Sequence, residues 1–130
     1  MIKFLESNTS ILNYDTNIVR KAYTLSNDDN IIGYATINKD ENNLMFIYVL
    51  PKYRGYGYGQ ILFDEVLLEV QKLKYEKVYC TFSKNNMQMV RIMQKRKATW
   101  LGSNKEKVKY VINLTHKAND DILKNSDDER

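Results

Sequence analysis

The sequence predicts an α+β fold in which one mixed β-sheet is flanked by helices. Strand-like apolar stretches outnumber helical ones, and only two segments show the three- to four-residue spacing of an amphipathic helix. The expected order is one strand, three strands, a helix, a strand, a helix and two strands. The chain has 130 residues, of which 43% are hydrophobic and 28% charged, as is usual for a soluble globular protein. This length suffices for one domain with a single core.

The first part of the chain is expected to form strands. Residues 2–6 form the first strand, and residues 7–17 are polar and irregular, with room for one short helical turn at most. Strand-like residues 18–26 and 31–38 flank the turn signal Asn-Asp-Asp-Asn at 27–30, which predicts a hairpin. Within this hairpin, a glycine at position 33 is a candidate bulge.

A central strand and the longer helix follow. Residues 44–50 are almost wholly apolar, as expected of a strand that is buried on both faces. Residues 59–74 have the strongest helical periodicity, with charged side chains on much of the opposite face. Its apolar residues are Leu62, Phe63, Val66, Leu67, Val70 and Leu73.

The last third contains a second helix between strands. Asn85 and Gln88 have the three-residue spacing of a capping box, which predicts a helix over residues 86–97. The remaining strands are expected at 77–82, 98–101 and 107–114.

A glycine-rich loop lies between the central strand and the longer helix. From residue 51 to 60 it reads Pro-Lys-Tyr-Arg-Gly-Tyr-Gly-Tyr-Gly-Gln. Alternating glycines let the chain bend sharply, so that several backbone N–H groups can point at one spot. The following helix adds unpaired N-terminal donors and the positive end of its dipole. Such a loop suits a phosphate or pyrophosphate.

The glycine spacing distinguishes this loop from other nucleotide-binding loops. A Gly-x-Gly-x-x-Gly fingerprint fails, because Gln60 and Leu62 stand where its last glycine would be. A Walker loop fails because Gln60, and not lysine, follows Gly59. Two alternatives stay open: a Gly/Tyr-rich RNA-binding segment and a plain strand-to-helix turn.

The motif Arg54-x-x-Gly57-x-Gly59 resembles the acyl-CoA pyrophosphate loop of the GNAT superfamily of N-acyltransferases. A Val-x-Pro-x-Tyr-Arg-Gly lead-in that starts at Val49 strengthens the resemblance, which extends over residues 18–115. It implies a GNAT-like fold and transfer of an acetyl group from acetyl-CoA to a primary amine.

One departure concerns the family's two helices between its first and second strands. Residues 7–17 leave no room for both, which implies a shortened N-terminal helical region. An open acceptor cleft would follow, and it favours a bulky acceptor such as a protein amine over a small metabolite.

The resemblance also implies which residues bind coenzyme. Backbone N–H groups from Arg54 to Gln60 would hold the pyrophosphate, and Lys52 is a candidate for the 3′-phosphate or a solvated surface lysine. Asn86 matches the family's pantetheine-contacting asparagine, with helix capping as the alternative. The implied coenzyme-binding residues are Val49, Leu50, Arg54, Gly55, Tyr56, Gly57, Tyr58, Gly59, Gln60 and Asn86.

The sequence assigns no catalytic acid or base. Met45 and Phe46 align with the family's glutamate base, and Met93 aligns with its tyrosine acid; none of the three can exchange a proton. Tyr48 and Glu41 are the remaining candidates. Two hypotheses follow: a slow N-acetyltransferase, and a catalytically weak or inactive acyl-CoA-binding sensor.

Charge and composition bound the partners. The net charge is +4, and residues 116–130 contain three basic and five acidic side chains, so the rest of the chain is the more basic part. A basic body suits an anionic coenzyme and, less favoured here, a nucleic acid. We expect a GNAT-like acyltransferase domain over residues 1–115 and a polar, disordered C-terminal tail over 116–130; the sequence leaves a homodimer open.

The remaining expectations concern metals and location. Cys80 is the only cysteine and His116 the only histidine, so no metal site is expected and Cys80 reads as a buried apolar residue. The N-terminus lacks a signal-peptide core, and no apolar run has the length of a membrane span. A cytoplasmic protein is therefore expected.

Overall fold

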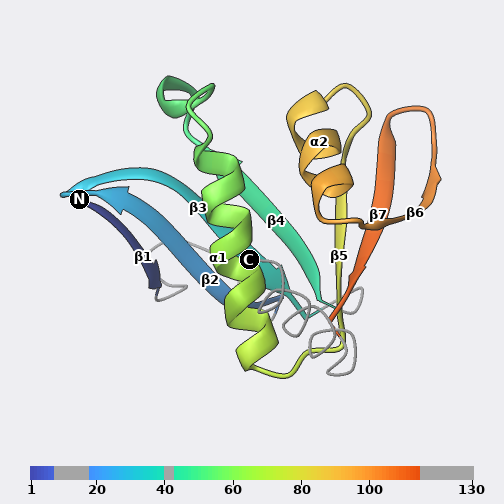
Figure 1. Cartoon of the computed structure of the whole chain (residues 1–130), viewed down its shortest axis with the longest axis horizontal. Helices are drawn as coiled ribbons and strands as arrows, with labels where there is room; N and C mark the ends of the chain where they lie inside the picture. Colours follow the sequence, from blue (N-terminus) through green and yellow to red (C-terminus); the bar gives the residue numbers. More distant parts are fainter. Residues whose placement is uncertain (8–17, 40–42, 115–130) are drawn as a thin grey trace, which may run out of the picture.

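A seven-stranded sheet organises the chain in the computed structural model, which describes residues 1–7, 18–39 and 43–114 (Figure 1). The spatial order of the strands is β1-β2-β3-β4-β5-β7-β6. All neighbours pair antiparallel except β4 and β5, which are parallel, so the predicted mixed sheet is confirmed. The strands are β1 (Ile2–Glu6), β2 (Val19–Asn27), β3 (Asn30–Asn38), β4 (Leu44–Val49), β5 (Lys77–Ser83), β6 (Thr99–Ser103) and β7 (Lys107–Asn113).

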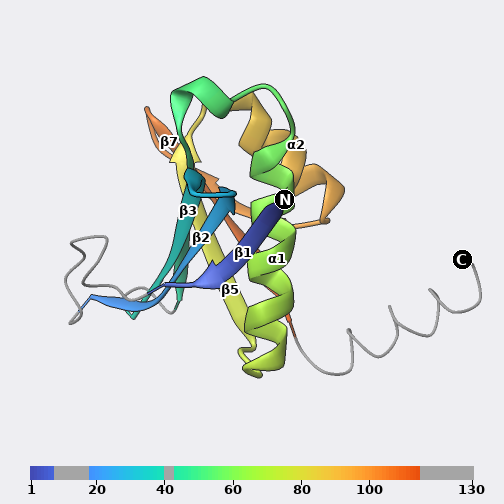
Figure 2. The same ribbon diagram turned by 90° about the vertical axis from the view of Figure 1, so that its left-hand side faces the viewer.

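Two helices cover one face of this sheet (Figure 2). They are α1 (Tyr58–Lys72) and α2 (Met87–Lys95), and a 3₁₀ turn, η2 (Pro51–Tyr53), precedes α1. Both helices contribute to a core that includes residues of β2–β5 and β7. The apolar stripe of α1 is buried as predicted, except that Leu73 is 41% exposed because the helix ends one residue before it.

The β2–β3 hairpin turns where the sequence predicts. Asp28, in the turn, adopts a positive φ of 55°. The register changes from Leu25 opposite Gly33 to Ser26 opposite Ile31, so the bulge lies beside the predicted glycine. Gly33 itself permits close packing on β4, because a Cβ there would lie 2.5 Å from the Tyr48 carbonyl oxygen.

The prediction that the central strand is buried on both faces is wrong. In β4, Met45 faces the helices and is buried, whereas Phe46 and Tyr48 are 44% and 39% exposed. The alternation of a strand sends these two side chains to the opposite face. Among the residues that the structure describes, no helix covers that face.

Two findings concern membrane spans and the predictions made for residues outside the described ranges. None of the helices in the described ranges is long and apolar enough to span a membrane. The predictions for Glu41, His116, the polar tail and the shortened N-terminal region fall outside the described residues.

Cys80 is predicted to be unreactive in the folded protein. The thiol is buried in the core, and this burial raises its pKa from 9.0 to about 12. At pH 8 an aromatic disulfide reagent should therefore release aryl thiolate from the unfolded protein and not from the native one. Absorbance of the released thiolate, with and without denaturant, measures this.

The pH dependence of stability supplies a second readout for the same residue. Because the folded-state pKa is raised, the thiol's contribution to stability is complete below pH 9 and declines as the pH rises toward 12. The Cys80→Ala variant should lack this decline. Equal alkaline slopes for the two proteins would contradict the assignment.

Candidate functional site

The two parallel strands at the centre of the sheet separate soon after they meet. Only Leu44–Tyr79 and Met45–Cys80 pair between β4 and β5, and Figure 1 shows the strands diverging toward the end where α1 and α2 begin. Asn43 accepts from the Tyr79 N–H at 3.1 Å on the β5 side, whereas the Leu50 N–H bonds to Ile32 in β3. Because hydrogen-bonding directions alternate along a strand, the backbone N–H and C=O groups of residues 47 and 49 face the β5 side. They form no ladder hydrogen bond to β5, since the pairing ends at Met45.

A cavity of about 290 Å³ lies beside the unpaired end of β4. Its walls come from the end of β4, the start of α1 and the first two turns of α2. The lining residues are Ile47, Tyr48, Val49, Arg54, Gly59, Asn86, Gln88, Met89 and Ile92. Four of the predicted coenzyme-binding residues thus lie together there: Val49, Arg54, Gly59 and Asn86. Leu50 and the remaining loop residues do not line it.

The glycine-rich loop has the backbone geometry that its sequence predicts. Gly55 and Gly57 adopt φ values of 88° and 85°, which L-residues with a Cβ rarely reach. Gly57 is the N-cap of α1, and no side chain caps this end. The Arg54 N–H bonds to the Pro51 carbonyl at 3.2 Å, but within the described ranges no bond is formed by the N–H groups of residues 55–60.

These free donors define the loop's chemistry. Six consecutive N–H groups at the positive end of the α1 dipole form no hydrogen bond to a backbone acceptor in the described part of the chain. Such an arrangement favours an anion with several oxygen atoms.

Arg54 turns its side chain back toward β4. Its Nε donates to the Val49 carbonyl oxygen at 2.8 Å, and its guanidinium lies 5.1 Å from the centre of the Tyr48 ring. The arginine therefore satisfies one of the two carbonyls that the missing β5 pairing leaves open. It also brings a permanent positive charge to the cavity wall.

Gln88 is a lining residue that the sequence did not identify. The capping-box prediction is wrong by one position: Asn86, not Asn85, caps α2, and its Oδ1 accepts from the Met89 N–H at 3.2 Å. Gln88 is thereby freed and reaches across to α1, where a Cβ on Gly59 would lie 3.1 Å from its Nε2. A side chain at position 59 would therefore press on the flexible end of Gln88.

The catalytic candidates are dispersed. Met45 and Met93 are buried in the core, and Phe46 lies on the face away from the helices. Tyr48 alone among the described candidates lines the cavity, and Glu41 falls outside the described residues. No group of three or more His, Cys, Asp or Glu side chains in the described ranges could hold a metal ion.

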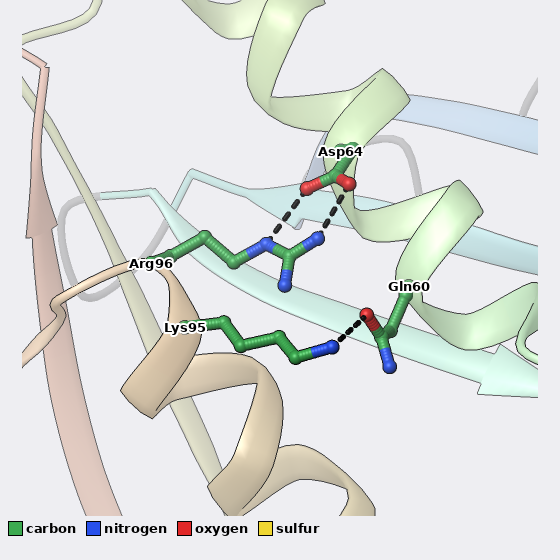
Figure 3. A network of polar contacts seen from close by, with 4 residues as sticks. All are labelled: Gln60, Asp64, Lys95 and Arg96. Carbon is green, nitrogen blue, oxygen red and sulfur yellow. Dashed lines mark hydrogen bonds and ion pairs between the residues drawn. The ribbon is translucent and has the colours of Figure 1, made fainter. Parts of the chain in front are cut away.

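Polar contacts join the two helices beside the cavity (Figure 3). Arg96, just after α2, forms a two-fold pair with Asp64 of α1, with its Nε 2.7 Å from Oδ1, and its guanidinium lies 5.9 Å from the Phe63 ring centre. Lys95 donates to the Gln60 side-chain oxygen at 3.3 Å. Gln60 therefore binds α2 through its side chain while its N–H remains free.

Comparison with known proteins identifies a family and a fold. The sequence model of the acetyltransferase (GNAT) family matches residues 5–97. No curated protein sequence matches the chain. Solved structures that resemble it include the ribosomal-protein-S18-alanine N-acetyltransferase of Escherichia coli, with a TM-score of 0.72, 11% identity, and coverage of 88% of this chain and 95% of that one.

Two further structures have the same fold at low identity. An N-acetyltransferase from Staphylococcus aureus Mu50 has a TM-score of 0.73 and 13% identity, covering 88% of this chain and 99% of the other. A Bacillus subtilis acetyltransferase solved in complex with CoA has a TM-score of 0.71 and 12% identity, with the same coverage of 88% and 99%.

The Gly57→Ala variant is predicted to be destabilised by about 1–2 kcal/mol, because alanine disfavours the positive φ at this N-cap. It should also weaken binding of anions at the start of α1. Chemical denaturation and calorimetric titration with CoA measure the two effects. Gly102→Ala is the matched control: Gly102 also has a positive φ, but it lies in β6. Unchanged CoA affinity in Gly57→Ala would contradict the assignment.

The Asp64–Arg96 pair is predicted to stabilise the fold by at most about 1 kcal/mol, because Asp64 is half exposed. A double-mutant cycle with Asp64→Asn and Arg96→Gln, followed by urea denaturation, isolates this interaction. Glu65→Gln is the control, since Glu65 forms no ion pair with a described residue. Strictly additive losses would show that the pair contributes nothing.

Proposed function

The chain belongs to the acetyltransferase (GNAT) family, and we propose that it transfers an acetyl group from acetyl-CoA to a primary amine of a bulky acceptor such as a protein. One observation carries this proposal: six N–H groups, at positions 55–60, form no backbone hydrogen bond in the described part of the chain, and they precede or begin α1 beside a cavity at the unpaired end of β4.

The residues present fit the coenzyme. The free N–H groups of the loop suit a pyrophosphate, and Arg54 adds positive charge beside them. Lys52, whose ammonium lies 5.2 Å from the centre of the Tyr53 ring, is a further candidate for a phosphate contact. The backbone N–H and C=O groups of Ile47 and the N–H group of Val49, which have no partner in β5, suit the amides of a pantetheine arm. Met89 and Ile92 form an apolar part of the cavity wall.

The reaction forms a bond between the amine nitrogen and the acyl carbon and breaks the bond from that carbon to sulfur. The coenzyme supplies the activated acyl group. The amine loses one proton to water, because the positions matched to the family's base hold Met45 and Phe46. The sulfur leaves as a thiolate and takes its proton from water. Met93 cannot supply that proton, because it is a thioether buried in the core. Tyr48 lines the cavity, but its ring packs near Tyr34 on the face of β4 that points away from the helices, so the geometry assigns no proton donor to the leaving sulfur.

Positioning would then supply most of the rate. Loss of general acid and base help typically costs about 10²–10⁴-fold per step. Holding two reactants in contact can compensate for much of that loss. These considerations support a slow enzyme.

A second candidate is an acyl-CoA-binding sensor with little or no turnover. The replacement of proton-exchanging side chains by Met45, Phe46 and Met93 favours it. Both candidates require coenzyme binding, and they differ in whether an amine consumes the coenzyme. The cytoplasmic location remains a prediction for either one.

The test is a titration with acetyl-CoA, CoA and ATP followed by an assay for free thiol. At a hundredfold excess over Kd, acetyl-CoA should raise the free energy of unfolding by about 2.7 kcal/mol, and ATP should not. Sustained thiol release that needs an added amine supports the enzyme; binding without release supports the sensor. Absence of any coenzyme effect would refute both.

A variant of the loop refines this test. Arg54→Met keeps an unbranched side chain and removes the charge, and it should weaken CoA binding about tenfold. Arg91→Met removes an exposed charge from α2 as the control. Equal CoA affinities in the two variants would argue against a role for Arg54.

A further inference from the structure

A second cavity lies on the face of β4 that points away from the helices. Its volume is about 400 Å³. The lining residues on which the argument depends are Ile18, Tyr34, Asn38, Phe46, Ile47 and Tyr48. We call it the open-face groove.

The open-face groove and the 290 Å³ cavity proposed for the coenzyme, here called the coenzyme cavity, meet at the same two residues of β4. Ile47 and Tyr48 line both, at the part of β4 that β5 no longer pairs with. The Tyr48 ring lies 5.2 Å from that of Tyr34 in the groove and 5.1 Å from the Arg54 guanidinium in the coenzyme cavity. A molecule in the groove thus has its end at Tyr48, beside the place proposed for the acyl group.

The groove is built for an apolar group. Phe46 and Tyr48 present aromatic surface to solvent beside Tyr34 and Ile18, and no Asp, Glu, Lys or Arg is among its described lining residues. A multiply charged amine would find no counter-ion there. An aromatic or branched aliphatic side chain would bury apolar area against these rings.

One polar atom marks the far end of the groove. The Asn38 Oδ1 is buried, and no described residue donates a hydrogen bond to it. An unpaired buried acceptor is costly, so it points to an N–H donor supplied by a ligand. Asn38 stands four residues along β3 from Tyr34, which is roughly 13 Å in an extended strand. A small arylalkylamine is too short to span that length, whereas a peptide of about four residues spans it.

We propose that the open-face groove binds the amino-terminal segment of a peptide whose first residue has an aromatic or branched apolar side chain. The amino group lies at Tyr48, the first side chain rests on Phe46 and Tyr34, and a later backbone N–H bonds to Asn38. This inference rests on the proposed function, because it names the acceptor of that reaction. In the transfer, the terminal nitrogen bonds to the acyl carbon, the carbon–sulfur bond breaks, and the proton from the amine goes to water.

The experiment compares four acceptors at fixed acetyl-CoA. They are a peptide that begins with Phe, the same peptide beginning with Ser, the Ser peptide with a blocked amino terminus and one internal Lys, and spermidine. Thiol release should give a kcat/KM for the Phe peptide at least about tenfold above the others. Equal rates for the Phe and Ser peptides, or faster transfer to the Lys peptide or spermidine, would overturn the inference.

Direct binding separates failure of this inference from failure of the proposed function. Calorimetry of the Phe and Ser peptides in the presence of CoA needs no turnover. Preference for the Phe peptide without thiol release would support the groove and refute the transferase. Equal affinity, or no binding by either peptide, would overturn the inference even if other amines are acetylated.

A pair of variants locates the effect. Phe46→Ser should lower kcat/KM for the Phe peptide about tenfold, change that for the Ser peptide little, and leave the KM for acetyl-CoA unchanged. Leu68→Ser, which removes an exposed apolar side chain from α1, is the matched control and should change none of these values. An unchanged preference in a folded Phe46→Ser protein would exclude the open-face groove as its source.

Discussion

The early end of pairing between β4 and β5 is the constraint on which the site depends. A parallel pair normally continues its ladder along both strands, but here it stops after two residue pairs. Backbone groups of residues 47 and 49 consequently face a gap in the middle of the sheet. Unpaired backbone groups at such depth are costly unless something bonds to them. The Arg54 side chain bonds to one carbonyl, and a ligand with amide groups would satisfy others.

The surrounding elements hold this gap open. Apolar contacts of α1 and α2 with the sheet fix the position of each helix, and the Asp64–Arg96 pair links the helices to one another. The glycines of the loop let α1 begin beside the gap without a capping side chain, so that its free N–H groups remain available. The β4–β5 gap and the glycine-rich loop therefore lie together, because both are at the same end of β4.

Much of the fold could be predicted from local patterns. The hairpin turn at Asp28, the apolar stripe of α1 and the order of helices and strands along the chain all arise from residues close in sequence. Three features could not be predicted from local patterns. The end of the β4–β5 ladder depends on packing between distant segments. The exposure of Phe46 depends on which face of the sheet is covered, and an apolar strand does not reveal that. The role of Gln88 depends on whether α2 is capped by Asn85 or Asn86, and a shift of one residue turns its side chain by about 100°.

The division of labour between backbone and side chains explains why the family's loop can be present when its acid and base are not. Six N–H groups and a helix dipole would suit an anion whatever side chains stand nearby, provided that Gly55 and Gly57 keep their φ values. Proton transfer, by contrast, depends on single side chains, and the positions matched by resemblance to the family's base and acid include Met45 and Met93, two core residues that carry no exchangeable proton. A chain can therefore lose general acid and base help without losing coenzyme binding. Any catalysis that remains must come from placing the amine accurately, and the face of β4 that carries Phe46 and Tyr48 is the part of this site that offers a surface for doing so.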